Sequence, residues 1–365
     1  MSTAPRREPL LRVVSRPEKS PRQVLLLRLE SVLLSLAAGG VFILLIGYNP
    51  FEIYATILSG AFRSRMAVQA TVKYAIPLVI ASLGVTLAFR MRFWNIGAEG
   101  QIIMGAVFAS YFALFHAGWN HWLLIAVMLL AGALGGGLWG LIPALCKVRW
   151  NTNETLLTLM LNYIALHIVS YLRDGPWRDM EAAGFSKIAR FDKNAALDKV
   201  LGVHFGWIIA LLLVAAVFVY LGRTKQGYEI AVVGESQETA RYAGMNVRRI
   251  ILRTMALSGA VCGLGGMIQA TGADITLTTA VAGGVGFTAI IVAWLAQLNA
   301  PMILVVSILF SVLEKGAGVV QSTYGISSNC AAVLQGIILF FILGCEFFVR
   351  YTVVPRGKGG CRNAA

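Results

Sequence analysis

The feature that most constrains the fold of this chain is a series of long apolar blocks, which follow one another from residue 27 to residue 349. A helix needs about 20 apolar residues to cross the hydrocarbon core of a bilayer, and most of the blocks approach or reach that length. Only 13% of the residues are charged, whereas soluble domains carry about 25%. A soluble globular fold and a disordered chain are both excluded. We therefore expect an all-α, polytopic integral membrane protein.

The blocks predict about ten transmembrane helices, near residues 27–48, 67–89, 93–115, 121–145, 153–172, 205–222, 250–270, 284–299, 300–320 and 329–349. The sequence Asn299-Ala300-Pro301 is a turn signal that separates two of these spans with almost no connection. If the region 284–320 is partly re-entrant, the count is eight or nine. The spans form one membrane domain over residues 25–350, flanked by a disordered basic tail at 1–24 and a second basic tail at 351–365.

The basic residues predict the orientation of these spans. The net charge is +14, and Lys and Arg gather in the two tails and in most of the even-numbered connections. This distribution is typical of cytoplasmic segments that face anionic lipid headgroups. Both termini are therefore expected on the cytoplasmic side, with an outside loop at 173–204 and a cytoplasmic loop at 223–249. Nucleic acid is not an expected partner, because no basic face is interleaved with stackable aromatic residues.

No pattern in the chain supports catalysis or binds a cofactor. HExxH, GxSxG and the GxxxxGK[ST] phosphate loop do not occur, so the chain is not expected to be an enzyme. The five cysteines never form a CxxC pair, and no metal site is predicted. Gly132, Gly136 and Gly140 recur every four residues and share one helix face, where a neighbouring helix can approach closely. They serve packing within the chain or an interface with a second subunit.

A polar cluster interrupts the apolar sequence where the third span begins. In FWNIGAEGQ (93–101), Asn95, Glu99 and Gln101 are interspersed with two glycines. Glycines allow a helix to break, and a broken helix frees backbone groups that can line a cavity. One interpretation is that these side chains border a translocation path, and the other is that Glu99 caps free amides at a helix N-terminus. Asn162, deep in the fifth span, either joins the path or hydrogen-bonds to another helix.

Four motifs, in this order, resemble the membrane permease subunits of bacterial ABC importers: FWNIGAEGQIIMGA, NETLLTLMLNYIA, GESQETARYAGMNVRRI and GFTAIIVAWLAQLNAP. They are similar to the branched-chain amino acid and simple-sugar permease superfamily, and most of all to its nucleoside branch, which works with receptors of the basic-membrane-protein type. The resemblance implies a non-catalytic subunit in the bacterial cytoplasmic (inner) membrane. It also implies three protein partners: a separate ATPase subunit, a homologous second permease that forms a heterodimer with this one, and a periplasmic or lipoprotein solute receptor.

The same resemblance gives the cytoplasmic loop a role. In this family a short helix docks into a groove of the ATPase subunit, and the matching residues here are Gly234, Glu235, Glu238, Ala240, Arg241 and Gly244. The residue pattern predicts one helix of about three turns between the two glycines. Its charged residues are spaced three apart, so they would share one face of that helix.

The function that these features favour is a transport subunit of an ATP-driven importer for a nucleoside or a related solute, with a ribose-type simple sugar as the alternative substrate. A second hypothesis is a stand-alone, ion-coupled secondary transporter. It requires a series of membrane carboxylates, and the spans offer mainly Glu99 and Glu314. A membrane enzyme is the third, and no nucleophile, metal site or acid–base pair supports it. The substrate stays open, because aromatic residues that could stack on a base are also common at membrane interfaces.

Overall fold

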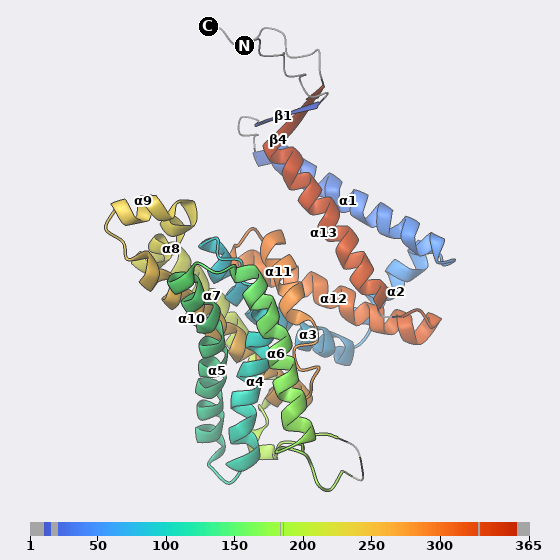
Figure 1. The fold of residues 1–365 in the computed structure, drawn as a ribbon. Coiled ribbons are helices and arrows are strands. Elements are labelled where there is room, and N and C mark those ends of the chain that lie inside the picture. The colour runs from blue at the N-terminus through green and yellow to red at the C-terminus, as the bar shows by residue number, and fades with distance from the viewer. Residues whose placement is uncertain (1–10, 16–20, 183, 185, 328, 356–365) are drawn as a thin grey trace. The chain divides into compact units, whose positions relative to one another are not determined.

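The computed structural model describes residues 11–15, 21–182, 184, 186–327 and 329–355 (Figure 1). The chain divides into two units. Unit 1 contains the residues up to Ile57 and those from Ala317 onward, and unit 2 contains Leu58–Gly316. Two helices cross the boundaries between the units, namely α2 (Pro50–Phe62) and α12 (Ala300–Tyr324).

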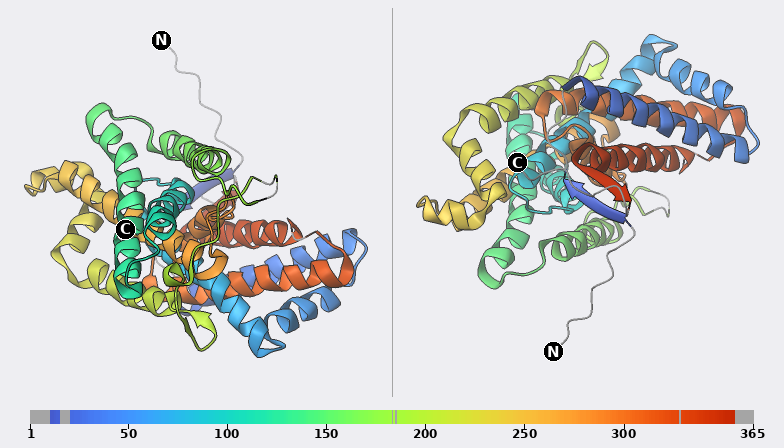
Figure 2. Two further views of the ribbon diagram at one scale, coloured as in Figure 1. Left: turned by 90° about the horizontal axis from the view of Figure 1, so that it is seen from below. Right: turned by 90° about the horizontal axis from the view of Figure 1, so that it is seen from above.

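Unit 1 pairs the two ends of the chain. Helix α1 (Pro21–Leu45) packs along α13 (Asn329–Arg350). Strand β1 (Leu11–Ser15) pairs antiparallel with β4 (Tyr351–Pro355), as the right-hand view of Figure 2 shows. The prediction of a disordered tail at 1–24 is therefore wrong for these residues and for the start of α1. The reason is that both tails contain short runs rich in β-branched residues, which favour a strand once a partner strand is present.

The first apolar block does not form the single span expected at 27–48. Helices α1 and α2 are inclined by 111° to each other across a break of a few residues. Gly47 has a φ of +94° there, a conformation that glycine adopts without steric cost. The Asn49 side chain then accepts a hydrogen bond from the Phe51 N–H at 3.1 Å. The block is therefore a broken span or a re-entrant loop.

Unit 2 holds most of the helices: α3 (Arg65–Arg90), α4 (Ala98–Phe115), α5 (His121–Trp150), α6 (Glu154–Asp174), α7 (Gly206–Arg223), α8 (Lys225–Glu235), α9 (Gln237–Tyr242), α10 (Val247–Ile268) and α11 (Val285–Leu295). Helix α10 continues into a π-helical turn, Gln269–Asp274. Figure 1 shows α4, α5 and α6 running side by side. The expectation of a mostly helical, polytopic fold is thereby confirmed, with two small two-stranded sheets in addition.

The expected count of ten spans is not confirmed. Within the described residues, seven helices are long and apolar enough to cross a membrane, and the bent pair of α1 and α2 makes eight. The predicted span at 284–299 is α11, which has 11 residues. At 1.5 Å per residue it extends about 16 Å, roughly half of a bilayer core. The re-entrant alternative for this region therefore fits the structure better than two full spans.

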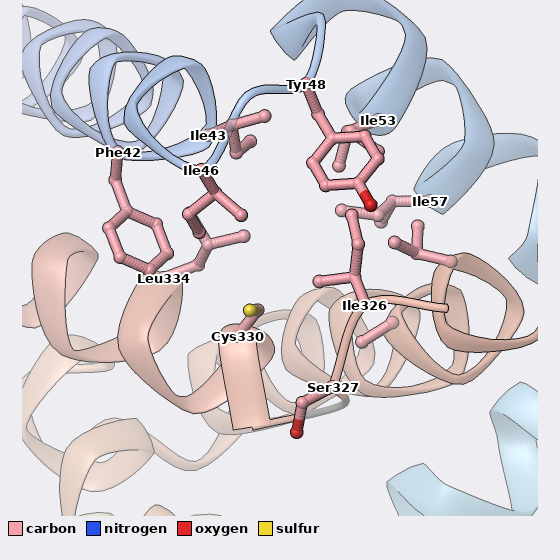
Figure 3. Close-up of a pocket in the computed structure, with 12 residues that line it drawn as sticks. Phe42, Ile43, Ile46, Tyr48, Ile53, Ile57, Ile326, Ser327, Cys330 and Leu334 are labelled. Atoms are coloured by element: carbon pink, nitrogen blue, oxygen red, sulfur yellow. The ribbon is translucent and has the colours of Figure 1, made fainter. Parts of the chain in front are cut away.

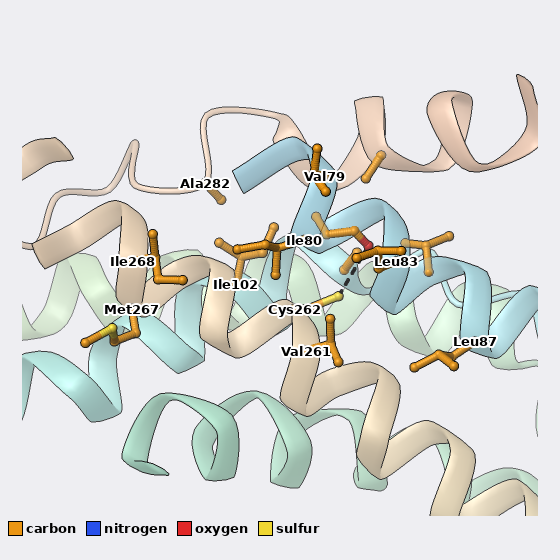
Figure 4. Close-up of a cluster of buried hydrophobic side chains, with 14 of the residues drawn as sticks. Val79, Ile80, Leu83, Leu87, Ile102, Val261, Cys262, Met267, Ile268 and Ala282 are labelled. Carbon is orange, nitrogen blue, oxygen red and sulfur yellow. Dashed lines mark hydrogen bonds between the residues drawn. The ribbon is translucent and has the colours of Figure 1, made fainter. Parts of the chain in front are cut away.

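The core of unit 2 surrounds α10, which packs against α3, α4 and α5. Large side chains such as Ile80, Leu83 and Met267 are fully buried there (Figure 4). Where α10 meets α5, the side chains give way to glycines. A Cβ atom added at Gly136 would collide with the carbonyl oxygen of Gly259, and one added at Gly263 would collide with α5.

The predicted glycine face of α5 therefore lies inside the chain. Gly132 and Gly140 meet α10 in the same way as Gly136, one turn to either side. Close approach of two backbones increases van der Waals contact between helices in a membrane, where lipid removes the hydrophobic driving force. These three positions belong to internal packing.

The connection after α6 folds onto the π-helical turn. It contains a 3-10 turn (Lys193–Ala195) and a small hairpin of β2 (Lys199–Val200) and β3 (Val203–His204). The Leu197 N–H donates to the Thr271 carbonyl at 3.1 Å, and the Phe191 N–H donates to the Ile275 carbonyl at 3.0 Å. The loop predicted at 173–204 is thus hydrogen-bonded to the end of the π-helical turn at Phe191 and Leu197.

Candidate translocation site

The polar cluster predicted from the sequence lies at a break between α3 and α4. The Asn95 side chain is fully buried. Its Oδ1 accepts a hydrogen bond from the Gly97 N–H at 3.0 Å, and its Nδ2 donates to Gln101 Oε1 at 3.2 Å and to Ser258 Oγ at 3.3 Å. Ser258 lies on α10 and donates in turn to the Gly84 carbonyl at 2.6 Å. Asn95 therefore joins the break to both α4 and α10.

Helix α6 binds further backbone groups at the break. Asn162 Oδ1 accepts from the Gly100 N–H at 2.8 Å, while Asn162 Nδ2 donates to the Ile96 carbonyl at 2.9 Å. Thr158 Oγ1 accepts from the Ile96 N–H at 3.2 Å. Unsatisfied backbone groups cost several kcal/mol at membrane depth. These side chains replace the hydrogen bonds that a continuous helix would make.

Glu99 connects this break to a second one. Its Oε1 accepts from the Gly284 N–H at 2.8 Å and its Oε2 accepts from the Gly286 N–H at 2.7 Å. Gly284 is the N-cap of α11 and has a φ of +82°. A side chain at Gly286 would collide with the backbone of Glu99. The carboxylate thus sits where the amides and the dipole of α11 favour negative charge.

The structure brings all four predicted residues together at the break before α4, where each makes hydrogen bonds, and we call this set the break network: Asn95, Glu99, Gln101 and Asn162. The capping interpretation of Glu99 holds in an altered form, because the capped helix is α11 and not α4, on which Glu99 lies. Sequence reasoning did not link the glycines before α11 to Glu99, and it missed Ser258. No local pattern marks such a pairing, since Glu99 and Gly284 are 185 residues apart.

Aromatic rings flank the break network. The rings of Trp94 and Trp294 stack at 5.8 Å between centroids with 25° between their planes, and Phe89 contacts both. Trp94 and Trp294 remain 46% and 39% exposed. A partly exposed aromatic cluster therefore joins the break before α4 to the last turn of α11, where Trp294 lies.

The loop predicted to meet the ATPase does not form a single helix from Gly234 to Gly244. Helix α8 ends at Glu235, and Ser236 is extended with a φ of −156°. The Ser236 Oγ accepts a hydrogen bond from the Thr239 N–H at 3.2 Å, so it caps the separate six-residue helix α9. A serine favours an N-cap over a helix interior, which is the physical reason for the division.

The division changes the positions of the predicted residues. Gly234 and Glu235 lie in the last turn of α8 and no longer share a helix face with Glu238 and Arg241. On α9, Glu238 and Arg241 are exposed, whereas Ala240 is fully buried. Gly244 follows α9 with a φ of +76°, as the expectation of a helix-ending glycine requires.

His204 is the least expected buried group of unit 2. It lies in β3, ahead of the span formed by α7, and is 1% exposed. Neither ring nitrogen has a hydrogen-bond partner among the described residues. Burial lowers the pKa of His204 to about 4, and the nearby charge of Lys73 acts in the same direction. The ring is therefore neutral at physiological pH and packs against Gly206 and Gly272.

A metal site and an apolar pocket are the other kinds of candidate functional site. In the part of the chain that the structure describes, no three His, Cys, Asp or Glu side chains lie close enough together to hold a metal ion. Unit 1 contains a pocket between α1, α2, α13 and the end of α12, shown in Figure 3. Its lining is mostly aliphatic, with Tyr48, Ser327 and Cys330 as its polar members. This lining suits an acyl chain better than a polyhydroxyl solute.

The fold and the break network define a polytopic membrane protein in which broken helices meet in the interior, as in many transport proteins. The family described as "Branched-chain amino acid transport system / permease component" matches residues 67–343. The chain belongs to this family.

Individual relatives are similar over most of the chain. The glucose ABC transporter permease protein TsgB13 of Haloferax volcanii is 31% identical, and the match covers 88% of each chain. The guanosine ABC transporter permease protein NupP of Bacillus subtilis is 30% identical over 92% of this chain and 97% of the relative. A second guanosine permease protein of Bacillus subtilis, NupQ, is 29% identical over 61% of this chain and 72% of the relative.

Proposed function

We propose that the chain is the membrane permease subunit of an ATP-binding-cassette importer and forms the translocation path for a nucleoside. The observation that carries this proposal is the similarity to the guanosine permease protein NupP along 92% of the chain. The stacked surface of Trp94 and Trp294 suits a planar base. A simple sugar is the alternative substrate, because a glucose permease protein is equally similar.

The proposed path passes the break network. Non-helical backbone is tolerated at membrane depth only where it is buried in protein or lines a cavity. The breaks around Asn95 and Gly284 meet at Glu99, which is partly buried, while Asn95, Gln101 and Asn162 are almost fully buried. We infer that Glu99 borders the path and that the other three hold its shape. A solute passing through needs hydrogen-bonding groups that bind it weakly, since a tight site would trap it.

The orientation of unit 2 supports the proposed ATPase partner. The ends of α3, α5 and α7 with their basic residues, and the start of α10, lie at the same end as α8 and α9. We call this the basic end and assign it to the cytoplasm by the excess of Lys and Arg. Exposed Glu238 and Arg241 on α9 would then face the ATPase subunit.

Two further partners and the location complete the proposal. Because two different guanosine permease proteins of Bacillus subtilis are similar to this chain, we infer a heterodimer with a homologous second permease. The loop bound to the π-helical turn lies at the end opposite the basic end, where a periplasmic or lipoprotein receptor would dock. We further propose the bacterial inner membrane as the location, with both chain termini in the cytoplasm, because both tails are rich in Lys and Arg.

The test is reconstitution of the chain with its ATPase, its partner permease and its receptor in proteoliposomes. We expect uptake of guanosine that requires ATP and all four components. Glucose and ribose are tested in the same way as alternative transported solutes. Uptake of ribose alone would favour the alternative substrate. Uptake driven by an ion gradient through this chain by itself would overturn the proposal and favour a secondary transporter.

A further inference from the structure

The segment proposed to meet the ATPase is anchored to the membrane helices mainly through α8. Helix α9 has only six residues and is attached chiefly to α8. Helix α8 contacts α3, α7 and α10. At its C-terminal end, Gly234 lies directly against the backbone of Arg90, so that no side chain separates α8 from the end of α3. Motion imposed on α9 therefore has two routes to the core, one through α8 and one through the short connection Ala243–Asn246 that leads into α10.

One ion pair joins α8 to α10. Arg253 Nη2 on α10 lies 3.0 Å from Glu229 Oε2 on α8. The two side chains are only 30% and 17% exposed, so solvent screens their attraction less than that of a surface pair. The other ion pair of this segment, Arg92–Glu235, is 3.9 Å long, and its side chains are 67% and 84% exposed. The segment thus has one strong and one weak electrostatic attachment.

The Glu229–Arg253 ion pair lies close to the break network, because Arg253 and Ser258 are near each other on α10. Ser258 follows Arg253 by five residues, about one and a half helical turns. Through its hydroxyl, Ser258 accepts from Asn95 and donates to the Gly84 carbonyl of α3. Hydrogen bonds thus connect α10 to Asn95 and Gln101, and the first turn of α4 connects these residues to Glu99, which binds the N-terminus of α11.

We propose that Glu229 and Arg253 are positioning residues that couple the ATPase-facing segment to the translocation path. The ion pair holds α8 against α10, so that a displacement of α8 and α9 moves α10 and the break network with it. This inference rests on the proposed function, because it requires an ATPase to move the segment. Loss of the pair would leave ATP hydrolysis possible while less solute crosses for each ATP consumed.

The experiment measures guanosine transported per ATP hydrolysed in the complete reconstituted complex. Glu229→Arg and Arg253→Glu should each lower this ratio at least about fivefold, and the double variant with exchanged charges should restore most of it. If a charge reversal prevents folding, the milder variants Glu229→Gln and Arg253→Met are used instead, each alone and combined in one uncharged double variant. For these the single changes lower the ratio and the uncharged pair does not restore it.

Lys147–Glu154 provides the matched control. It joins α5 to α6 at the same end of unit 2 with an N···O distance of 2.9 Å, and its side chains are 25% and 16% exposed. It joins neither α8 nor α9 to another helix. Exchanging these charges should leave the transport ratio unchanged. An equal loss of transport per ATP in the Lys147 and Glu154 variants would overturn the inference, and so would a normal ratio in all Glu229 and Arg253 variants. In both cases ATP-driven uptake by the wild-type complex would still support the proposed function. If the wild-type complex shows no ATP-driven uptake, it is the proposed function that fails.

Discussion

The contact between α5 and α10 and the contact between α4 and α11 join helices of the same unit in opposite ways. Along α5 and α10, glycines remove the side chains and the two backbones touch over two turns. Between α4 and α11, one carboxylate accepts two backbone amides. Close packing offers no alternative arrangement of similar energy, whereas two hydrogen bonds can break and form again. The comparison indicates that α5 and α10 form one rigid body, which moves as a whole, and that the contact between α4 and α11 is a junction that can open and close.

The largest expected effect comes from filling the rigid contact. Gly136→Leu places a side chain against the Gly259 carbonyl and should destabilise the protein by about 3 kcal/mol or more. The measurement is the melting temperature and yield of the purified protein. Gly118→Leu is the control, because nothing lies within 4 Å of a Cβ at that position. A folded Gly136→Leu protein with normal yield would contradict the description of α5 and α10 as one rigid body.

Removal of the Glu99 carboxylate tests the junction. Hydrogen bonds to a charged group contribute about 1.5–3 kcal/mol each, so Glu99→Ala should cost about 3 kcal/mol and lower uptake strongly. Glu99→Gln keeps one acceptor oxygen and should retain roughly half of the stability. Thermal melting and uptake are measured for both variants. Equal stability of the two variants would argue against capping of α11, and normal uptake in Glu99→Ala would remove Glu99 from the path.

The pH dependence of stability tests the region where the loop meets the π-helical turn. His204 has a pKa of about 4 in the folded protein, below the ordinary value of about 6.5. The unfolded chain therefore binds the proton more readily, so stability falls as the pH drops from about 6.5 to about 4, by at most about 3 kcal/mol. His204→Gln should flatten this part of the unfolding curve against pH. An identical flattening in the exposed control His167→Gln would show that another group is responsible.

The smallest of these effects concerns the turn after α9, in the segment proposed to meet the ATPase. This turn lies outside the α5–α10 and α4–α11 contacts. Gly244 has a φ of +76°, and a β-branched residue there costs about 1–2 kcal/mol. Gly244→Val should therefore reduce ATPase stimulation and uptake, while the melting temperature of unit 2 changes little. Gly222→Val serves as control, since no atom lies within 4 Å of a Cβ there and its φ is not positive. Wild-type coupling in Gly244→Val would count against a role for this turn.

Charge reversal on α9 gives a companion test. Exchanging Glu238 and Arg241, which are exposed and three residues apart, should weaken binding of the ATPase subunit more at low salt than at high salt. Association is measured by titrating the purified subunit. Salt-independent binding would show that these charges do not face the ATPase.

The spans and the first break could be predicted because their causes are local. Apolar length produced α3, α5, α6 and α7 close to the expected residues, and the glycines around Asn95 marked the break before α4. Two of the wrong predictions, a single coupling helix and a full span at α11, also have local causes. Ser236 divided the expected coupling helix, and the apolar block at α11 was too short to cross the membrane.

The sequence by itself determined a polytopic helical permease with polar groups at a helix break, since hydropathy and glycine position act over a few residues. Only the tertiary structure decided what those groups do. The amides that Glu99 accepts lie 185 residues away, and the carboxylate that Arg253 meets lies 24 residues away on another helix. It also placed Gly132, Gly136 and Gly140 against α10 inside the chain. Such pairings depend on how helices pack in three dimensions, and no spacing along the chain encodes them.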